Sequence, residues 1–523
     1  MTHATVTLKK RYLKLPVNTD MQRKNVAFYE NGVLIYDFDA HLDTVSPQFF
    51  TYMDLSHLIG KTVSIVTDPN IDINFSFVDE IPQEGVYQEP YRPLVHFSTK
   101  IGWINDPNGL VYQNDEYHLF YQHNPAGNVW GNMTWGHAIS RDLVHWVEQS
   151  DALFPDKLGT MFSGSAVTDT DNVAGFQKDN TRPMLLFYTA AGGNSKLSQG
   201  QSFTQCLAYS LDNGKTFTKY ENNPVIPHIE GGNRDPKVVY AEELDCYLLA
   251  LYLDGDRYTL FQSNDLRHFT QLQTFSLPGD DECPDLYPLL ADHNETDRKW
   301  VFVGASDVYL VGDMTAEGFI PCQKALPYFY GHRTSYAAQT FSGTKNRRIK
   351  IAWEILHAPN QIFENQMGIP CEVTLTKQNG IYRLCTLPVD EFKTLRQAET
   401  KYTVNSAKVS ATLNKNAYDI SITLSRTSPD CTLSLFGHTF HIFQARNEFS
   451  YDNVTTPLSY TDRPITLRLI VDTLGVEIFL DGGLIYTVKA GITDYSIKEL
   501  TLQSHDDTAL SGTLTVYELH SIH

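Results

Sequence analysis

The 523-residue sequence lacks the features of a membrane-spanning or exported precursor. No apolar run approaches the roughly 18 residues that a membrane-spanning helix needs. The N-terminal segment MTHATVTLKKRYLKLPVNTD also has no apolar core of the length that a signal peptide requires. We therefore expect a cytoplasmic protein, or a secreted one if a leader has been removed from the sequence, and no membrane partner.

Cysteines are few and follow no metal-binding or disulfide pattern. Seven are present, at positions 206, 246, 283, 322, 371, 385 and 431. An odd number without a Cys-x-x-Cys pair argues against a disulfide framework and a zinc site, and it favours a reducing compartment. Four histidines lie close together in the sequence, but in strand and turn segments this residue is more often structural: His118, His123, His137 and His145. No metal and no cofactor is expected.

Positive charge is scarce. The chain has 41 Lys and Arg against 61 Asp and Glu, a formal net charge of −20. Nucleic acids and anionic membrane surfaces bind basic patches, so this balance argues against both as partners. A neutral ligand such as a sugar agrees best with the charge.

Aromatic and β-branched residues are abundant and predict an all-β protein. The sequence has 29 Tyr and 28 Phe, residues that favour strands over helices. At roughly 100–200 residues per domain, the length predicts about three domains with buried cores.

The first predicted domain spans residues 1–88. The segment VAFYENGVLIYDFDA (26–40) predicts two strands joined at Asn31-Gly32, because Asn-Gly supplies the positive φ angles of a tight hairpin. Alternating patterns at 61–68 and 71–79 predict further strands of a small antiparallel β domain. Proline and glycine at 80–93 indicate a linker.

A repeated layout marks the second predicted domain, residues 91–385. GHAISRDLVHW (136–146), LAYSLDNGKTF (207–217) and TLFQSNDLRHF (259–269) each combine an apolar strand, Ser-x-Asp, a turn and an aromatic residue. We interpret each as a hairpin in which Ser and Asp accept turn amides while the aromatic side chain returns to the core. Such units at intervals of about 50–70 residues are typical of propeller blades. The alternative is three unrelated hairpins.

The third region begins with a predicted linker helix at 389–399, VDEFKTLRQAE. From 400 to 523, alternating strands such as YDISITLS, ITLRLIVD and VEIFLDGG follow, with frequent turns. This spacing predicts a β-sandwich.

Three acidic residues of the middle region stand in a shared setting. Asp106 and Asp235 are each followed directly by Pro, Glu282 is followed by Cys283-Pro284, and each motif leads into an apolar run. A Pro at the first position of a strand costs no ladder hydrogen bond, so three strand starts are predicted. Equivalent strand ends of a propeller converge on one central opening, which would bring the carboxylates together. Taken singly, each Asp-Pro is better interpreted as a turn.

Converging carboxylates among aromatic residues agree with glycoside hydrolysis. One carboxylate must be ionised, to attack the sugar or to stabilise its cation. Another must hold a proton for the leaving oxygen, for which we expect a raised pKa. The residues alone do not assign these roles.

The motifs GWINDPNG, FSGSA (162–166), NRDPK (233–237) and ECPDLY (282–287) resemble the signatures of glycoside hydrolase family 32, in the same order. That family contains invertases, inulinases and levanases. The resemblance covers about residues 91–523 and leaves the first 88 as an addition. It implies a five-bladed β-propeller followed by a C-terminal β-sandwich, and a retaining mechanism.

The resemblance also implies roles. Asp106 would be the nucleophile, Glu282 the general acid and base, and Asp235 the stabiliser of the oxocarbenium-like transition state. Arg234 offers donors to carboxylates and hydroxyls. The remaining substrate-binding residues would be Asn105, Gln122, Trp130, Phe162, Ser163, Tyr336 and Trp353. Core packing is the alternative for the two tryptophans, and Cys283 shapes the surroundings of Glu282 rather than reacting.

The segment WGNMTWGHA is closer to exo-inulinases and levanases than to sucrose hydrolases, where a Pro commonly stands in place of Asn132. This favours a β-fructofuranosidase that releases terminal fructose from inulin- or levan-type fructans or oligosaccharides, with sucrose as a poorer substrate. Two alternatives remain: a fructosyltransferase with the same site and a non-catalytic sugar-binding propeller. The N-terminal domain could extend the binding cleft, bind glycan or mediate a homodimer.

Overall fold

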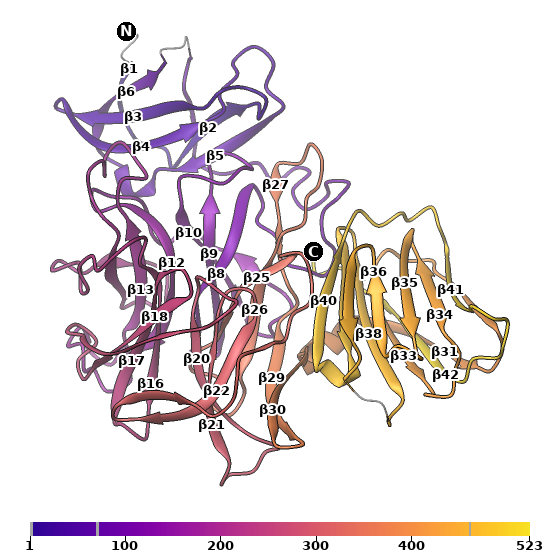
Figure 1. The fold of residues 1–523 in the computed structure, drawn as a ribbon. Coiled ribbons are helices and arrows are strands. Elements are labelled where there is room, and N and C mark those ends of the chain that lie inside the picture. Colours follow the sequence, from indigo (N-terminus) through magenta and orange to yellow (C-terminus); the bar gives the residue numbers. More distant parts are fainter. Residues whose placement is uncertain (1–3, 70–72, 460–461) are drawn as a thin grey trace.

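The computed structural model describes residues 4–69, 73–459 and 462–523, which form strands almost throughout. Figure 1 shows two small N-terminal sheets at one end of a ring of five sheets, with a pair of six-stranded sheets beside the ring. The predicted fold class is confirmed: an all-β chain with a five-bladed propeller, a C-terminal β-sandwich and an additional N-terminal β domain. Within the described residues, no helix is long and apolar enough to cross a membrane.

The N-terminal sheets have the strand orders β1-β6-β3-β4 and β5-β2-β7 and enclose one buried apolar cluster. Their elements are β1 (Ala4–Thr7), β2 (Tyr12–Val17), β3 (Lys24–Glu30), β4 (Val33–Ala40), β5 (Phe49–Asp54), the 3₁₀ helix η1 (Ser56–Leu58), β6 (Thr62–Asp68) and β7 (Ser76–Val78). The hairpin turn has φ of 51° at Asn31 and 81° at Gly32, as predicted. The strand predicted at 71–79 is shorter in the structure, and residues 71–72 lie outside the described residues. Residues 79–101 form neither helix nor strand.

The five blades are antiparallel sheets of strands taken in chain order. Blade I has β8 (Gly102–Gln113), β9 (Glu116–Asn124), β10 (Thr134–Ser140) and β11 (Val147–Glu148); blade II has β12 (Thr160–Thr168), β13 (Met184–Ala191), β14 (Thr204–Ser210) and β15 (Thr218–Lys219). Blade III has β16 (Arg234–Ala241), β17 (Cys246–Asp254), β18 (Arg257–Ser263) and β19 (Thr270–Ser276).

Blade IV has β20 (Asp285–Leu290), β21 (Arg298–Val303), β22 (Val308–Thr315) and β23 (Gly318–Pro321), with β24 (Leu326–Pro327) paired to β22. Blade V has β25 (Ser335–Thr340), β26 (Ile349–Glu354), β28 (Gln366–Met367), β29 (Cys371–Gln378) and β30 (Ile381–Pro388). The short strand β27 (Phe363–Glu364), from the blade V segment, runs parallel to β8 and pairs Phe363 with Gly102. The last blade is thus hydrogen-bonded to the first, which closes the ring.

The three Ser-x-Asp segments form turns between the third and fourth strands of blades I to III. The hydroxyl–carboxylate pairs are Ser140–Asp142 at 3.0 Å, Ser210–Asp212 at 2.8 Å and Ser263–Asp265 at 3.3 Å. Each aspartate also accepts turn amides, as in the 2.8 Å bond from the His145 amide to Asp142. The interpretation as repeated hairpins of a propeller is therefore confirmed.

The helix predicted at 389–399 is shorter in the structure and is a 3₁₀ helix. Residues Asp390–Leu395 form the 3₁₀ helix η2, and strand β31 begins at Arg396. From there the backbone pairs with β42 at the edge of the sandwich, Arg396 opposite Leu519. These ladder hydrogen bonds override the local helical preference of the sequence.

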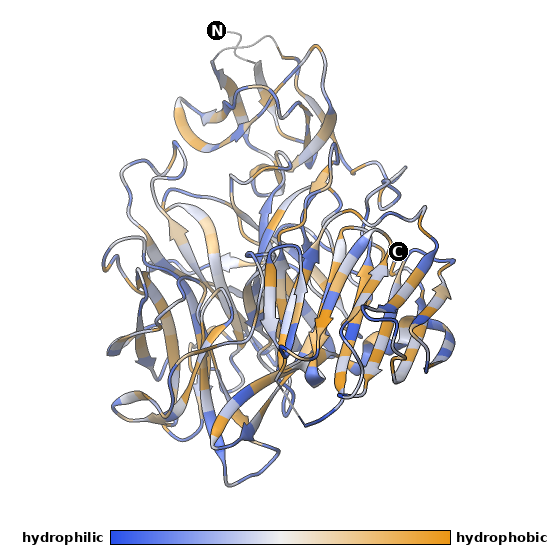
Figure 2. Ribbon diagram, turned by 45° about the vertical axis from the view of Figure 1, so that its right-hand side comes forward, coloured by the Kyte–Doolittle hydropathy of each residue, from blue (hydrophilic) through white to orange (hydrophobic). Residues whose placement is uncertain are grey.

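The sandwich consists of two six-stranded sheets, β31-β42-β33-β38-β39-β40 and β32-β41-β34-β35-β36-β37. Their bounds are β31 (Arg396–Val404), β32 (Lys408–Thr412), β33 (Tyr418–Leu424), β34 (Cys431–Leu435), β35 (His438–Phe443), β36 (Glu448–Tyr451), β37 (Val454–Pro457), β38 (Ile465–Asp472), β39 (Gly475–Leu480), η3 (Asp481–Gly483), β40 (Ile485–Ala490), β41 (Glu499–Ser504) and β42 (Gly512–Leu519). Apolar and polar residues alternate along many of these strands (Figure 2), because one face of each sheet forms the core of the sandwich. Strand β39 is buried on both faces, because its outer face packs against the propeller.

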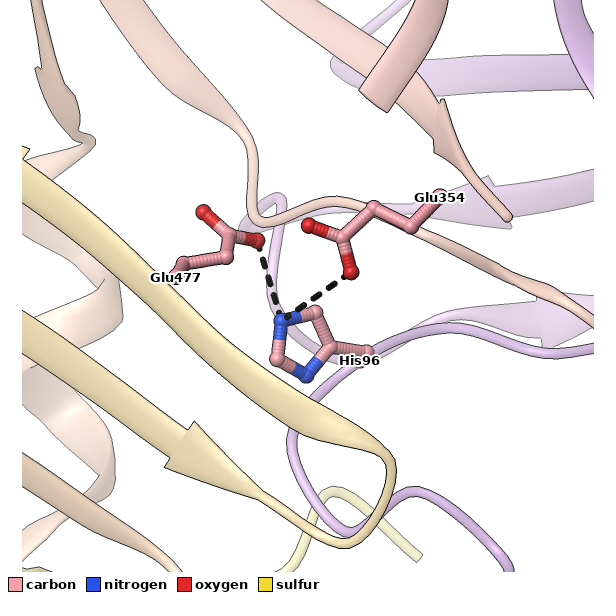
Figure 3. A group of neighbouring side chains, drawn as sticks. All are labelled: His96, Glu354 and Glu477. Atoms are coloured by element: carbon pink, nitrogen blue, oxygen red, sulfur yellow. Dashed lines mark hydrogen bonds and ion pairs between the residues drawn. The ribbon is translucent and has the colours of Figure 1, made fainter. Parts of the chain in front are cut away.

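A buried charged group joins the propeller to the sandwich (Figure 3). We call it the interface cluster; it consists of His96, Glu354 and Glu477, which Figure 3 labels, together with Asp472, which is not drawn. The His96 ring bonds Asp472 through Nδ1 at 2.8 Å and Glu477 through Nε2 at 3.0 Å. Burial lowers the pKa of His96, but these two bonds outweigh it, and the net pKa lies well above the usual value. The ring is therefore held as an imidazolium.

Candidate active site

Four blades carry an irregularity in their first strand. The register shifts between Ile104 and Pro107 in β8, Phe162 and Gly164 in β12, Arg234 and Lys237 in β16, and Tyr336 and Gln339 in β25. A β-bulge bends its strand and redirects a side chain that would otherwise alternate with its neighbours. Asp106, Ser163 and Asp235 each lie within one of these bulges, which turns predicted site residues out of the regular pleat.

The prediction that all three acids stand at strand starts is corrected for Asp106. Asp235 is the second residue of β16, and Glu282 precedes β20. Asp106, however, lies inside β8, which begins at Gly102. Pro107 is tolerated there because the bulge already interrupts the ladder.

The backbone around two of the acids is in the left-handed region. The φ angles are 66° at Asp235, 53° at Glu282 and 33° at Cys283. Such angles are unfavourable for residues with side chains, and they persist where the surrounding structure imposes them, commonly at functional sites.

Asp106, Asp235 and Glu282, here called the carboxylate cluster, come from blades I, III and IV and meet at Cys283. The Cys283 sulfur lies 3.4 Å from Oδ2 of Asp106 and 3.4 Å from Oδ2 of Asp235. The Cys283 amide also donates to Oδ2 of Asp235 at 3.1 Å. Because Glu282 is the preceding residue, one short segment brings all three acids together.

Asp106 accepts hydrogen bonds on both carboxylate oxygens. The Ser163 hydroxyl donates to Oδ2 at 2.6 Å, and Asn105 donates to Oδ1 at 3.1 Å. The Trp103 indole N–H orients Asn105 by donating to its amide oxygen at 2.9 Å. Burial raises the pKa of Asp106, and these donors offset it only in part.

The pKa of Asp235 is strongly raised. Burial raises it to about 7; the Arg234 guanidinium opposes the shift, while the negative charges of Asp106 and Glu282 add to it. Its backbone amide donates to the Thr189 hydroxyl at 2.9 Å, which ties the bulge to blade II.

Glu282 differs from the other two acids. Arg234 donates to Oε1, and the Tyr336 hydroxyl donates to Oε2 at 2.6 Å. Burial raises the pKa of Glu282, but these two donors outweigh it and the net pKa is lowered. A raised pKa was expected for the proton donor, Glu282. In this structure the pKa is raised at Asp106 and Asp235 and lowered at Glu282, because Glu282 contacts the Arg234 guanidinium and the Tyr336 hydroxyl.

Arg234 joins two acids from one side. Its Nε lies 3.7 Å from Oδ2 of Asp235 while its Nη2 bonds Glu282. The Gly232 carbonyl accepts from Nη1 at 2.7 Å, and the Tyr252 ring lies 4.6 Å below the guanidinium. These contacts fix the guanidinium plane, so it presents a rigid set of donors.

The predicted aromatic and amide residues border the carboxylate cluster. The Trp353 ring lies 6.3 Å from Tyr336 and 6.0 Å from Trp103. Gln122 is buried on β9 opposite the bulge of β8. In the part of the chain that the structure describes, nothing accepts from Gln122 Nε2 or Trp353 Nε1. A buried donor without an acceptor is costly, so both are suited to a ligand hydroxyl.

Trp130 and Phe162 lie at the outer edge of the site, with ring centroids 6.0 Å apart. Trp130 is 45% exposed, so core packing does not explain it. Phe162 directly precedes Ser163, the donor to Asp106.

Sequence reasoning missed Asp281, Trp103 and Thr189. Oδ1 of Asp281 lies 3.0 Å from the Tyr336 hydroxyl oxygen and accepts from Arg333 at 3.2 Å. Trp103 stands inside the GWINDPNG motif and Asp281 directly precedes the ECPDLY motif, so both positions were available as a signal. No sequence signal marks Thr189, because its contact with Asp235 depends on how blades II and III pack together.

Among the described residues, one group could bring three metal ligands together: His96, Glu354 and Glu477. Both ring nitrogens of His96 are already bonded to carboxylates. The ring has no lone pair left for a cation, and we interpret the group as an ion-pair cluster.

Known proteins share this architecture. The model of the glycosyl hydrolases family 32 N-terminal domain matches residues 96–386. With the propeller and its carboxylate cluster, this match defines a glycoside hydrolase. The chain belongs to glycosyl hydrolase family 32.

A levanase from Bacillus subtilis (strain 168) is 32% identical over 510 residues, covering 86% of this chain and 73% of that protein. An invertase from Debaryomyces hansenii is 34% identical over 324 residues, 58% of each chain. The crystal structure of exo-inulinase from Aspergillus awamori superposes with a TM-score of 0.75 at 26% identity, covering 84% of this chain and 100% of that one.

Proposed function

We propose that this protein is a retaining β-fructofuranosidase that hydrolyses terminal β-D-fructofuranosyl residues of fructans or fructooligosaccharides. The observation that carries the proposal is the contact of one sulfur, that of Cys283, with both Asp106 and Asp235, next to Glu282. A retaining glycosidase needs its nucleophile and its acid within about 5–5.5 Å of each other. The negative charge of Glu282 also raises the pKa of Asp106, so the two carboxylates are near neighbours, which agrees with retention.

In the proposed first step, Asp106 attacks the anomeric carbon of the fructosyl unit. The bond to the leaving oxygen breaks, and Glu282 gives that oxygen its proton. A fructosyl-enzyme ester forms on Asp106 and the shortened alcohol or sugar departs. Ser163 and Asn105 support the role of Asp106, because their hydrogen bonds orient its carboxylate and favour the ionised form.

In the second step, Glu282 accepts a proton from water as the water oxygen attacks the anomeric carbon. The ester bond to Asp106 breaks and fructose leaves with its anomeric configuration retained. Asp235 and Arg234 are proposed to bind the fructose hydroxyls and stabilise the positive charge of the transition state. Gln122 and Trp353 supply unpaired buried donors for other hydroxyls.

The first step requires a proton on Glu282, although Arg234 and Tyr336 lower the pKa of this residue. We propose that a bound sugar draws Arg234 towards its hydroxyls and weakens the contact with Glu282. Exclusion of water by the sugar would further raise the pKa of Glu282. The proton that Asp235 holds up to about pH 7 is then available to the cluster.

Fructans are the preferred substrate in this proposal, and sucrose is a poorer one. The proposal is supported by relatives that include a levanase and an exo-inulinase. Asn132 also supports fructans over sucrose as the preferred substrate. Proline, which is common at this position in sucrose hydrolases, cannot adopt the φ of 51° that Asn132 has.

The test is a rate comparison on sucrose, kestose, inulin and levan, with chromatographic analysis of the products. Release of fructose alone from levan or inulin is expected. Release of larger fragments would indicate endo action instead. Transfer products exceeding free fructose at high sucrose would favour the fructosyltransferase alternative, which uses the same residues. Absence of turnover on all four substrates would leave the non-catalytic propeller.

A cytoplasmic location and a homodimer remain predictions. All seven cysteines are free thiols, which supports a reducing compartment. Among the relatives, however, is an exo-inulinase whose name calls it extracellular. Fractionation and light scattering would test both predictions.

A further inference from the structure

The N-terminal sheets contact the propeller at the end where the carboxylate cluster lies. Asn124, the last residue of β9, pairs with Trp103 near the start of β8. Ala191, the last residue of β13, pairs with Thr160, the first residue of β12. The two loops that follow, residues 125–133 and 192–203, therefore leave their blades beside Asp106 and Ser163.

The first of these loops is hydrogen-bonded to β4 of the N-terminal sheets. The Asn132 side chain accepts from the Asp39 amide at 2.8 Å and donates to the Asp39 carbonyl at 2.7 Å. Arg23 donates to the carbonyl oxygen of Trp130 at 2.7 Å. The residues on both sides of Gly131 are thus held by residues of another domain, Trp130 through its backbone and Asn132 through its side chain.

The second loop is held by a buried carboxylate. Asp37, 4% exposed, accepts the Leu197 amide at 2.8 Å and the Lys196 amide at 3.0 Å. A carboxylate that receives two backbone amides fixes the loop more strongly than a neutral acceptor would.

Three aromatic side chains on or beside these loops form what we call the aromatic rim: Trp130, Phe162 and Phe203. Trp130 packs edge-on against Phe162 at 6.0 Å, and Phe162 packs edge-on against Phe203 at 5.4 Å. The rim leads outward from the carboxylate cluster, because Phe162 adjoins Ser163, which bonds Asp106. Trp130 is exposed and the two phenylalanines are half-buried, and accessible aromatic faces stack on the apolar sides of sugar rings.

We propose that Arg23 and Asp37 are positioning residues for the fructosidase reaction. They hold the loops that carry Trp130 and Phe203 so that the aromatic rim forms one wall against the bound sugar. The inference rests on the proposed function, and it extends the active site to residues outside the matched family region, which begins at residue 96. The N-terminal sheets are then a support of the site rather than a separate binding module.

The test is a double-mutant cycle between Arg23 and Trp130, measured on kestose, inulin and levan. Arg23→Ala is expected to lower kcat/KM about 10-fold, mainly through KM, since the rim binds sugar but performs no chemistry. In the Trp130→Ala background the same change is expected to alter kcat/KM less than about 2-fold, because its target is gone. Arg23→Lys keeps a donor for the Trp130 carbonyl and is expected to restore most of the loss.

The control is Arg141→Ala. Arg141 is an exposed arginine with one ion pair, to Glu116, at the opposite end of the same blade. It is expected to leave kcat/KM unchanged. Asp37→Asn serves as a second variant if Arg23→Ala does not fold, and it is expected to raise KM as well.

The outcomes separate the two proposals. A wild type inactive on every fructoside overturns the proposed function and this inference with it. If the wild type is active, and Arg23→Ala and Asp37→Asn both have the same kcat/KM as the wild type, the inference alone is overturned. Equal losses from Arg23→Ala with and without Trp130 also overturn it, because Arg23 would then act through general stability.

Discussion

The hydroxyl of Tyr336 donates a 2.6 Å hydrogen bond to Oε2 of Glu282, while the hydroxyl of Tyr258 donates at 3.1 Å to the backbone carbonyl of the same residue. Only the first bond stabilises the ionised carboxylate, and it is the largest influence that lowers the pKa of Glu282. The two tyrosines therefore form a matched pair for testing what the carboxylate does.

Tyr336→Phe is expected to raise the pKa of Glu282, because burial then acts against one donor instead of two. The alkaline limb of the pH profile of kcat should move to higher pH, and kcat should fall about 10-fold, as for the loss of one hydrogen bond to a charged group. Tyr258→Phe, the control, should leave the profile in place. An unmoved profile in Tyr336→Phe would count against Glu282 as the proton donor.

Asp106→Asn and Glu282→Gln are each expected to cut turnover of fructans by several orders of magnitude. The roles of nucleophile and proton donor can be distinguished with a nitrophenyl fructoside. Its leaving group is activated and departs without a proton from the enzyme. With this substrate, Glu282→Gln should regain a rapid first step that releases nitrophenol, while Asp106→Asn should not. Near-wild-type turnover in either variant on inulin would refute the assignment.

The pH dependence of kcat/KM should show an alkaline limb near pH 7. The carboxylate cluster must carry one proton to donate, and burial raises the pKa of Asp235 to about 7. Below this pH the proton is present; above it the proton is lost and activity declines. Since kcat/KM reports the free enzyme and kcat the complex, the two limbs should differ. A flat kcat/KM profile up to pH 9 would contradict this prediction.

Cys283 is expected to be unreactive although it lies at the centre of the carboxylate cluster. Burial and the nearby charges of Asp106 and Asp235 raise the pKa of its thiol well above the usual value, so little thiolate forms. With iodoacetamide at neutral pH, mass spectrometry should find the exposed Cys322 modified well before Cys283. Cys283→Ser, which keeps a donor, should retain activity within about 10-fold; selective alkylation of Cys283 would be the contrary result.

His96 should make stability depend on pH. Its folded pKa lies well above 6.5, so its contribution is complete below pH 6.5 and is lost as the pH rises towards the folded pKa. In that range the free energy of unfolding should fall by about 1.4 kcal/mol per pH unit from this group. His96→Gln should remove this slope in chemical denaturation, and His520→Gln, an exposed control, should not. Equal slopes in all three proteins would exclude the imidazolium.

The sequence motifs located the acids, but they could not describe how the acids are presented. Asp106 was expected at a strand start, and it instead lies in a bulge inside β8. Bulges depend on the register of two strands, which no local motif encodes. The partners of Asp235 show the same limit, since Thr189 reaches it only through the packing of blades II and III.

Local propensity misled at the junction of propeller and sandwich. The segment 389–399 has helical composition, yet Arg396 already pairs with β42. Which carboxyl groups have a raised pKa could not be predicted either. Which carboxyl group keeps a proton depends on where Arg234 and Tyr336 point, and both point at Glu282.

The interface cluster bears on how this enzyme can be recombined with its relatives. His96 enters from the propeller side, while Asp472 and Glu477 come from adjacent strands of the sandwich. A chimera with a sandwich lacking those two acids would bury an imidazolium beside Glu354 alone, and the reciprocal chimera would bury two carboxylates without a cation. The two halves are therefore exchangeable only as a matched pair, so a crossover point for recombination should be sought elsewhere than at residue 395.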